Sequence, residues 1–254
     1  MAVAPPLSRR RGDAWSTLAS GLGQTLLTLG VVLLLYVVYQ LWVTDLITAR
    51  DQDRLADRLR SEWSTGTAAA AAPAPPAEVP AGEPFVVLHV PRLAEDWARV
   101  AVEGTGEAEL SQGPGHYAGT ALPGEQGNTA FAGHRVGRGS PFLDLDAVRP
   151  GDPIVVETAD GWFTYRVLGD PATGDLAADP SGIPGMQIVT PSQVEVIAPT
   201  PGAPEAGPTG AYLTLTTCHP RYSAQQRLVV HAVLDGPGVT KAQAPDGPPA
   251  LTEG

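Results

Sequence analysis

The chain has 254 residues, a formal net charge of −11, 29 glycines, 26 prolines and a single cysteine. This length accommodates one ordinary domain with appendages. The acidic balance excludes a protein whose main task is to wrap nucleic acid, because such a protein needs a basic face. The abundance of glycine and proline favours a β-rich domain with many turns, flanked by segments without regular structure.

The apolar stretch near the start of the chain predicts a transmembrane helix over residues 18–43. Its core, Leu26–Val43, has eighteen residues without a charge, which is long enough to cross a bilayer of roughly 30 Å. Arg9–Arg11 precede it and Asp45 follows, so the positive-inside rule places residues 1–17 in the cytoplasm and the remainder outside the cell. The length of the run favours a single-pass anchor in the cell membrane over a cleaved signal peptide.

Two further segments flank the part of the chain that is expected to fold. Residues 44–84 predict a charged juxtamembrane helix, with Leu55 and Leu59 among its apolar positions, followed by an Ala/Pro-rich linker that begins near Ser64. Residues 236–254 are again rich in proline and glycine, which predicts a disordered C-terminal tail.

Residues 85–235 predict an all-β domain. Short runs of β-branched and aromatic residues alternate there with turn-forming residues, and no long amphipathic helix interrupts them. This pattern predicts a closed β-barrel or a sandwich, with short turns near residues 94–98 and 142–148. The expected strands cover residues 85–90, 129–132, 153–157, 162–168, 194–197, 212–217 and 227–234.

The lone thiol of Cys218 is the most informative side chain. It excludes an intramolecular disulfide and any zinc site that needs two or four thiolates. On an exported domain an unpaired thiol is exposed to oxidation, which favours a chemical role over simple packing. A nucleophilic thiol needs a partner, but His219 is expected to point to the opposite face of the strand. An antiparallel return over residues 219–226 would instead place Arg227 beside Cys218.

Five histidines compete for the role of base. His89 and His231 lie in apolar strand patterns that are typical of structural or surface residues. His116, in a glycine-rich loop, could line a cleft, whereas His134 follows a short strand and precedes a second glycine-rich loop, where catalytic side chains tend to lie. His134 leads His116 only modestly on these grounds. A metal site built on the two histidines lacks a third ligand, so no metal and no cofactor are predicted.

Two spaced motifs resemble those of the sortase family. The segment GHYAGTALPGEQGNTAFAGHR is similar to the family's histidine motif, and TLTTCHPRYSAQQRLVV is similar to its cysteine-to-arginine signature. The motif TLTTCHP, together with the preceding segment GTALPG, most resembles the motifs of class E sortases of Gram-positive actinobacteria. The resemblance implies an eight-stranded sortase β-barrel with His134, Cys218 and Arg227 as its catalytic residues.

The resemblance also implies the reaction and its partners. Cys218 would cleave the C-terminal sorting signal of a secreted protein, of LAXTG or LPXTG type, between Thr and Gly through a thioacyl intermediate. The acyl group would pass to an amine of a peptidoglycan precursor or to a pilin lysine, which the sequence leaves open. Arg227 would support the oxyanion, and His116 and Thr217 are further candidates for contact with substrate, Thr217 through its backbone amide.

Other readings of the sequence predict different patterns. An L,D-transpeptidase is expected to show a Ser-His-Gly-Cys motif, and a papain-like peptidase to carry its cysteine at a helix start with the histidine downstream. A non-catalytic anchored β-domain that binds a surface partner predicts a buried, unreactive Cys218. Asp144 and Asp146 are nearby acids of the kind that bind calcium, although ordinary loop carboxylates fit them as well.

Overall fold

The computed structural model describes residues 12–39, 44–65, 73 and 79–253, in two compact units that comprise residues 1–44 and 45–254. In the first unit, helix α1 (Gly12–Val38) is apolar along Trp15–Val38, with a mean hydropathy of 2.0. By length and composition it is one helix that could cross a membrane. The helix begins before the predicted residue 18, and residues 40–43 of the prediction lie outside the described residues, as do Arg9–Arg11.

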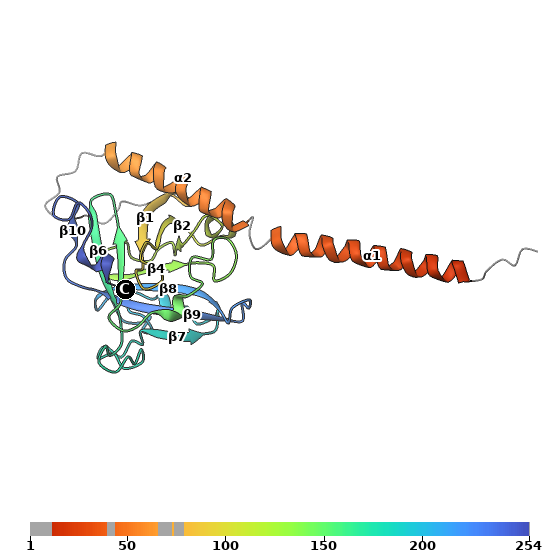
Figure 1. The fold of residues 1–254 in the computed structure, drawn as a ribbon. Helices are drawn as coiled ribbons and strands as arrows, with labels where there is room; N and C mark the ends of the chain where they lie inside the picture. The colour runs from red at the N-terminus through yellow and green to blue at the C-terminus, as the bar shows by residue number, and fades with distance from the viewer. Residues whose placement is uncertain (1–11, 40–43, 66–72, 74–78, 254) are drawn as a thin grey trace, which may run out of the picture. The chain divides into compact units, whose positions relative to one another are not determined.

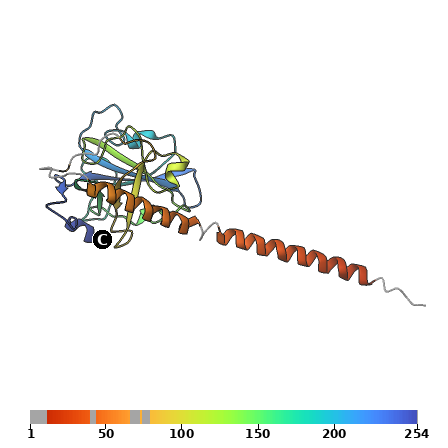
Figure 2. The same ribbon diagram turned by 90° about the horizontal axis from the view of Figure 1, so that it is seen from above.

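The second unit is a closed β-barrel (Figures 1 and 2). Its strands are hydrogen-bonded in the order β6-β5-β1-β2-β3-β4-β8-β9, and pairing of β6 with β9 closes the ring of eight. The β2–β3 and β4–β8 pairs are parallel, whereas the other neighbours in the ring are antiparallel. The ring strands are β1 (Pro84–His89), β2 (Ala98–Glu103), β3 (Gly115–His116), β4 (Gly127–Ala132), β5 (Pro153–Glu157), β6 (Gly161–Val167), β8 (Ala211–His219) and β9 (Gln226–Leu234).

The other elements within the described residues complete the domain. Strand β7 (Met186–Val189) pairs with β9, and β10 (Val239–Thr240) pairs with β6. The remaining helices are α2 (Thr44–Thr65), α3 (Glu107–Leu110), η2 (Leu145–Ala147), η3 (Val194–Ile197) and η4 (Pro249–Thr252). The predicted eight-stranded barrel is therefore confirmed. The prediction of a strand over residues 194–197 is wrong, because these residues form the 3₁₀ helix η3. The short or partly polar strands β2, β3, β7 and β10 were not expected.

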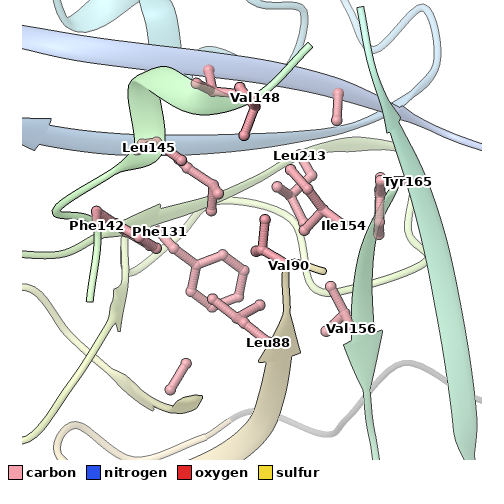
Figure 3. Packing of buried hydrophobic residues seen from close by; sticks show 14 of the residues in the cluster. Leu88, Val90, Phe131, Phe142, Leu145, Val148, Ile154, Val156, Tyr165 and Leu213 are labelled. Atoms are coloured by element: carbon pink, nitrogen blue, oxygen red, sulfur yellow. The ribbon is translucent and has the colours of Figure 1, made fainter. Parts of the chain in front are cut away.

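One hydrophobic cluster fills the barrel (Figure 3). Alternate residues of each strand point inward, so that Leu88 of β1, Phe131 of β4, Ile154 of β5 and Leu213 of β8 are all fully buried in contact with the cluster. Leu213 and Leu215 share the inward face of β8, as the alternation predicts. Thr214, Thr216 and Cys218 consequently point out of the barrel toward the segments that cover β8 and β9.

Helix α2 packs on the outside of β1 and β2 (Figures 1 and 2). Leu59 is 2 % exposed against Val87 and Val100. The Gln52 side-chain amide accepts from Val100 N at 2.8 Å and donates to Val100 O at 3.0 Å. It thus satisfies both backbone groups of Val100, as a neighbouring β-strand would. The predicted juxtamembrane helix is thus part of the folded domain.

The structure differs from the expectation of a disordered tail over residues 236–254. Trp162 Nε1 donates to Ala244 O at 3.0 Å, and Ala250 of η4 packs against Trp162 and Val155. Lys241 forms an ion pair with Glu157 and lies over the rings of Trp162 and Trp63. The proline- and glycine-rich tail is held because it covers a large aromatic ring that the barrel alone leaves on its surface.

Candidate active site

Cys218 and Arg227 face each other across neighbouring strands. Near the end of β8 and the start of β9, the antiparallel register pairs Cys218 with Arg227 directly. Directly paired residues point to the same face of a sheet, with Cβ atoms about 4.5–5.5 Å apart. Both residues are half-buried. The return over residues 219–226 therefore has the geometry that the nine-residue spacing predicts.

Arg227 lines a pocket on the outer face of the barrel. Its Nη1 donates to the carbonyl oxygens of Ala224, at 2.9 Å, and Gln226, at 3.0 Å. The pocket has a volume of about 180 Å³, and its wall includes Arg227, Thr216, Tyr117 and η3. A larger cavity of about 640 Å³ lies between α2 and β2, but its lining includes none of Cys218, Arg227 and His134. Of these three residues, only Arg227 lines the smaller pocket, and we associate this pocket with the site through that side chain.

The parallel pairing of β4 with β8 brings the segment that carries His134 alongside the end of β8, where Cys218 lies. Ala132 at the end of β4 is in register with Thr216, and Gly133 N continues the alignment by donating to Thr216 O at 3.0 Å. Thr217 Oγ1 then donates to Gly133 O at 2.8 Å. The segments that carry His134 and Cys218 are thus bound together immediately before both residues.

The environment of His134 favours the neutral form of its imidazole over the protonated form. Burial lowers the pKa of His134 below its ordinary value of 6.5; the positive charge of Arg138 lowers it further, and Glu107 opposes the change. The Nε2 atom is buried and has no hydrogen-bond partner among the described residues. An unpaired buried polar atom costs about 1–3 kcal/mol, and a catalytic role is one explanation for such an atom in a native fold.

Glycine at position 133 follows from close packing. A Cβ atom built there would lie 2.5 Å from a ring carbon of Phe142, so a larger residue would displace that ring. Phe142 is fully buried and stacks on Trp97 with ring centroids 6.2 Å apart. Its backbone N–H donates to His134 O at 3.2 Å, which closes the loop after His134 over the core.

Charged side chains join the loops that follow His134 and Cys218. Arg135, which is 2 % exposed, pairs with Asp146 at 2.8 Å and donates to His219 Nδ1 at 3.3 Å. Arg221 pairs with Asp144 at 2.8 Å and contacts Asp146 at 3.5 Å. His219 is thus held by Arg135 rather than by the thiol. Arg135 was not among the sequence-predicted site residues, although it directly follows His134 in the motif AGHR.

Desolvation raises the pKa of Asp146, but the charges of Arg135 and Arg221 and a backbone hydrogen bond outweigh it. The net effect is a pKa below the ordinary value of 3.8. Asp144 and Asp146 therefore act as ion-pair partners of arginines in this structure.

The side chains of the two further candidates for substrate contact both have partners within the fold. His116 is 1 % exposed; its Nδ1 lies 2.7 Å from Glu103 Oε2, and its Nε2 lies 3.1 Å from Ala121 O. Its ring also packs against Phe85 and Phe131. The expectation of a cleft residue therefore differs from the structure, where His116 has no free face. The side chain of Thr217 is likewise committed, to Gly133.

This arrangement supports acyl transfer by a thiol. A thiolate at Cys218 is a strong nucleophile, and Arg227 offers permanent positive charge with several N–H donors beside it. A largely neutral imidazole with a free ring nitrogen can take up and return a proton. The order along the chain, with histidine before cysteine and the cysteine near a strand end, differs from the papain-like arrangement.

Comparison with known proteins identifies the family. The sortase domain model matches residues 88–235. Two curated relatives are sortases from Streptomyces coelicolor. SrtE1 is 34 % identical over 231 residues, covering 88 % of this chain and 59 % of SrtE1, so the chain spans less than two thirds of that relative. SrtE2 is 33 % identical over 230 residues, covering 87 % of this chain and 84 % of SrtE2.

Solved structures agree with the sequence relatives. SrtF from Corynebacterium diphtheriae has a TM-score of 0.62 and 36 % identity, covering 73 % of this chain and all of the SrtF chain. Sortase E1 from Streptomyces coelicolor has a TM-score of 0.55 and 31 % identity, covering 69 % and 99 % of the two chains. The resemblance to class E is therefore confirmed, and the chain belongs to the sortase family of cysteine transpeptidases.

Proposed function

We propose that this protein is a membrane-anchored sortase that transfers secreted proteins from a C-terminal sorting signal to an amine. The observation that carries the proposal is the register pair of Cys218 with Arg227, next to the β4 segment that delivers His134. In this mechanism Cys218 is the nucleophile, His134 is the general acid and base, and Arg227 binds substrate and supports the oxyanion.

The reaction has two acyl transfers. The Cys218 thiolate attacks the carbonyl carbon of the Thr–Gly bond, and the C–N bond breaks as protonated His134 gives its proton to the leaving glycine amine. The product is a thioester between Cys218 and the substrate threonine. An incoming amine then attacks the thioester carbon and gives a proton to His134, and Cys218 leaves as a thiolate. No outside oxidant or reductant is required.

The substrate is proposed to be an extended peptide of the LAXTG type, with LPXTG as the alternative. Class E membership supports the preference for alanine. Sortase E1 from Streptomyces coelicolor was crystallised with a tripeptide in its active site, which supports a peptide ligand for the pocket beside Arg227. The Thr217 backbone amide is a further proposed donor to the oxyanion.

Anchoring by α1 fits this substrate. A protein retained at the membrane by its own hydrophobic tail presents its sorting signal near the bilayer, and an enzyme on the same surface meets it at a raised effective concentration. We propose that the catalytic domain lies outside the cell. The incoming amine is then a peptidoglycan precursor or a lysine of another surface protein.

The test uses the full-length protein in detergent micelles with an LAXTG peptide and an amine such as triglycine. We expect release of the glycine-side fragment and formation of the new amide, both abolished in Cys218→Ala. Turnover that persists in Cys218→Ala would overturn the mechanism. A non-catalytic surface domain instead predicts no turnover and a Cys218 that resists alkylation in the folded protein.

Two further comparisons resolve the substrates. Parallel assays with LPXTG test the class E preference, and a higher kcat/KM for the proline peptide would contradict it. Competition between a peptidoglycan-type amine and a lysine-containing pilin peptide identifies the preferred acceptor.

A further inference from the structure

A chain of buried hydrogen bonds crosses the outer face of the barrel, the same face on which Cys218 and Arg227 lie. Thr214 and His231 are directly paired on β8 and β9, four pairs before Cys218 and Arg227 and on the same face of the sheet. Thr214 Oγ1 lies 2.9 Å from His231 Nδ1 and 2.7 Å from Asn128 Oδ1. His231 Nε2 lies 3.0 Å from the Gln187 side chain on β7. Asn128, Thr214 and His231 are each at most 1 % exposed.

Only one direction of donation satisfies every atom in this chain. The Asn128 amide nitrogen donates to the carbonyl oxygens of Ala198, at 3.0 Å, and Val196, at 3.3 Å. Its Oδ1 therefore accepts the single hydroxyl proton of Thr214, and Thr214 in turn accepts from His231 Nδ1–H. His231 Nε2 then accepts from Gln187. Burial lowers the pKa of His231 to about 4, so the ring has one donor and one acceptor, as this direction requires.

The chain ends at one wall of the pocket beside Arg227. Val196 belongs to η3, and Ala198 is the first residue after the end of this helix. Val194, Val196 and Ile197 line that pocket together with Arg227 and Thr216. Val196 also packs on Val229 of β9, which holds the segment to the sheet by apolar contact. Apolar contact alone does not set the orientation of this segment. The hydrogen bonds from Asn128 do so, because they fix two backbone carbonyls, those of Val196 and Ala198, in defined directions.

We propose that Asn128 is a positioning residue for substrate binding, which orients η3 and so sets the shape of the pocket beside Arg227. Thr214 and His231 hold the Asn128 amide in the orientation that donates to η3. The proposal rests on the proposed sortase function for its kinetic readout. Asn128 does not itself line the pocket, and it reaches the substrate only through the segment it holds.

The experiment compares isosteric variants of the full-length protein. Asn128→Asp keeps the acceptor for Thr214 but loses the two donors to η3, and Thr214→Val removes the hydroxyl that orients Asn128. We expect KM for the LAXTG peptide to rise roughly fivefold to tenfold in Asn128→Asp, as the loss of buried hydrogen bonds suggests, with kcat changed much less. Thr214→Val should give a smaller rise in the same direction.

A core variant is the matched control for lost stability. Ile154→Ala on β5 creates a cavity in the barrel, away from the pocket, since Ile154 is fully buried in the main cluster. We expect it to lower the unfolding temperature without raising KM. A KM in Asn128→Asp and Thr214→Val that equals the KM of Ile154→Ala would overturn the proposal. If Asn128→Asp does not fold, Thr214→Val gives the same comparison.

Hydrogen exchange separates this proposal from the proposed function. Amide protons of residues 194–198 should exchange faster in Asn128→Asp than in the wild type, whereas those of β5 should not. Unchanged exchange at residues 194–198 overturns the positioning role, even where the wild type transfers peptide. Faster exchange in a protein that transfers no peptide supports the positioning of η3 and contradicts only the sortase reaction.

Discussion

The hydroxyl of Thr217 donates to the carbonyl oxygen of Gly133 at 2.8 Å, although the two residues lie 84 positions apart. They stand directly before Cys218 and His134. Both are buried, so water cannot replace either partner and each polar atom depends on the other. Together with the bond from Gly133 N to Thr216 O, this side-chain hydrogen bond ties the residue before the proposed nucleophile to the residue before the proposed acid and base.

This bond predicts the effect of Thr217→Val, which keeps the shape of the side chain and removes the hydroxyl. Leaving the Gly133 carbonyl unpaired costs about 1–3 kcal/mol, and we expect kcat/KM to fall roughly tenfold because His134 loses its alignment with Cys218. Thr217→Ser retains the donor and should keep most of the activity. Equal losses in both variants would show that the methyl contacts, not the hydrogen bond, matter. Steady-state kinetics with the LAXTG peptide measure both.

The charges around His134 predict opposite shifts in the pH profile. Arg138 lowers the pKa of His134, so Arg138→Gln should raise it and move the acid limb of kcat/KM to higher pH. Glu107 acts in the other direction, so Glu107→Gln should move the same limb to lower pH. In the wild type the acid limb should lie below pH 6.5, because the net effect of burial and of the nearby charges is to lower the pKa of His134 below that value.

The pair of variants controls for unrelated effects. Arg138 and Glu107 form an ion pair at 3.3 Å with both side chains well exposed, and both variants break it. A loss of that pair alone would therefore change the two profiles in the same way. Shifts of the same sign in both variants would contradict the electrostatic explanation.

Helix α2 predicts a stability effect outside the barrel. Leu59→Ala removes a buried side chain between the helix and the sheet, and we expect the free energy of unfolding to fall by about 2–5 kcal/mol. Arg54→Ala on the same helix is the control, since its side chain is 79 % exposed; it should change stability by less than about 0.5 kcal/mol. Denaturant unfolding of the full-length protein, followed by tryptophan fluorescence, checks both. Equal stabilities would mean that α2 is not part of the cooperative unit.

Asp146 predicts an acid-dependent loss of stability. Its pKa in the folded protein lies below 3.8, so its ion pairs stabilise the fold above that pH, and the stabilisation is lost as the pH falls through the lowered pKa. Asp146→Asn should lower the unfolding temperature at pH 7, modestly because the carboxylate is 46 % exposed. The difference from the wild type should shrink as the pH is lowered toward 2. A difference that stays constant with pH would contradict the ionic origin.

Much of the fold and of the site could be predicted because it is encoded locally. The alternation of Leu213 and Leu215 with threonines specifies which face of β8 is buried, and the nine residues from Cys218 to Arg227 specify the pairing of the two strands. A short strand before His134 was visible in the same way. These features can be predicted from the alternation of side chains along a strand and from the antiparallel pairing of two strands joined by a short loop.

Other features depend on contacts that composition conceals. Helix α2 is highly charged and resembles a solvated helix, yet Gln52 and Leu59 bind β2. His116 lies in a glycine-rich segment typical of a surface loop, but Glu103 and the aromatic rings enclose it. Asn128 precedes His134 by six residues within the same motif, and its partners on β8 and near η3 come from distant parts of the chain. The pattern of residues in a single sequence does not reveal such long-range contacts.

The parallel pairing of β4 with β8 has a consequence for how the enzyme matures. Parallel neighbours cannot be joined by a tight hairpin, and here the intervening chain supplies β5, β6 and β7. Contacts so distant in sequence form slowly during folding. A nascent or truncated polypeptide that ends before β9 lacks Arg227 and has no complete site. In the proposed mechanism, the reaction of Cys218 with a peptide substrate therefore requires the finished domain, because Arg227 is synthesised after Cys218 and joins it only when β9 pairs with β8.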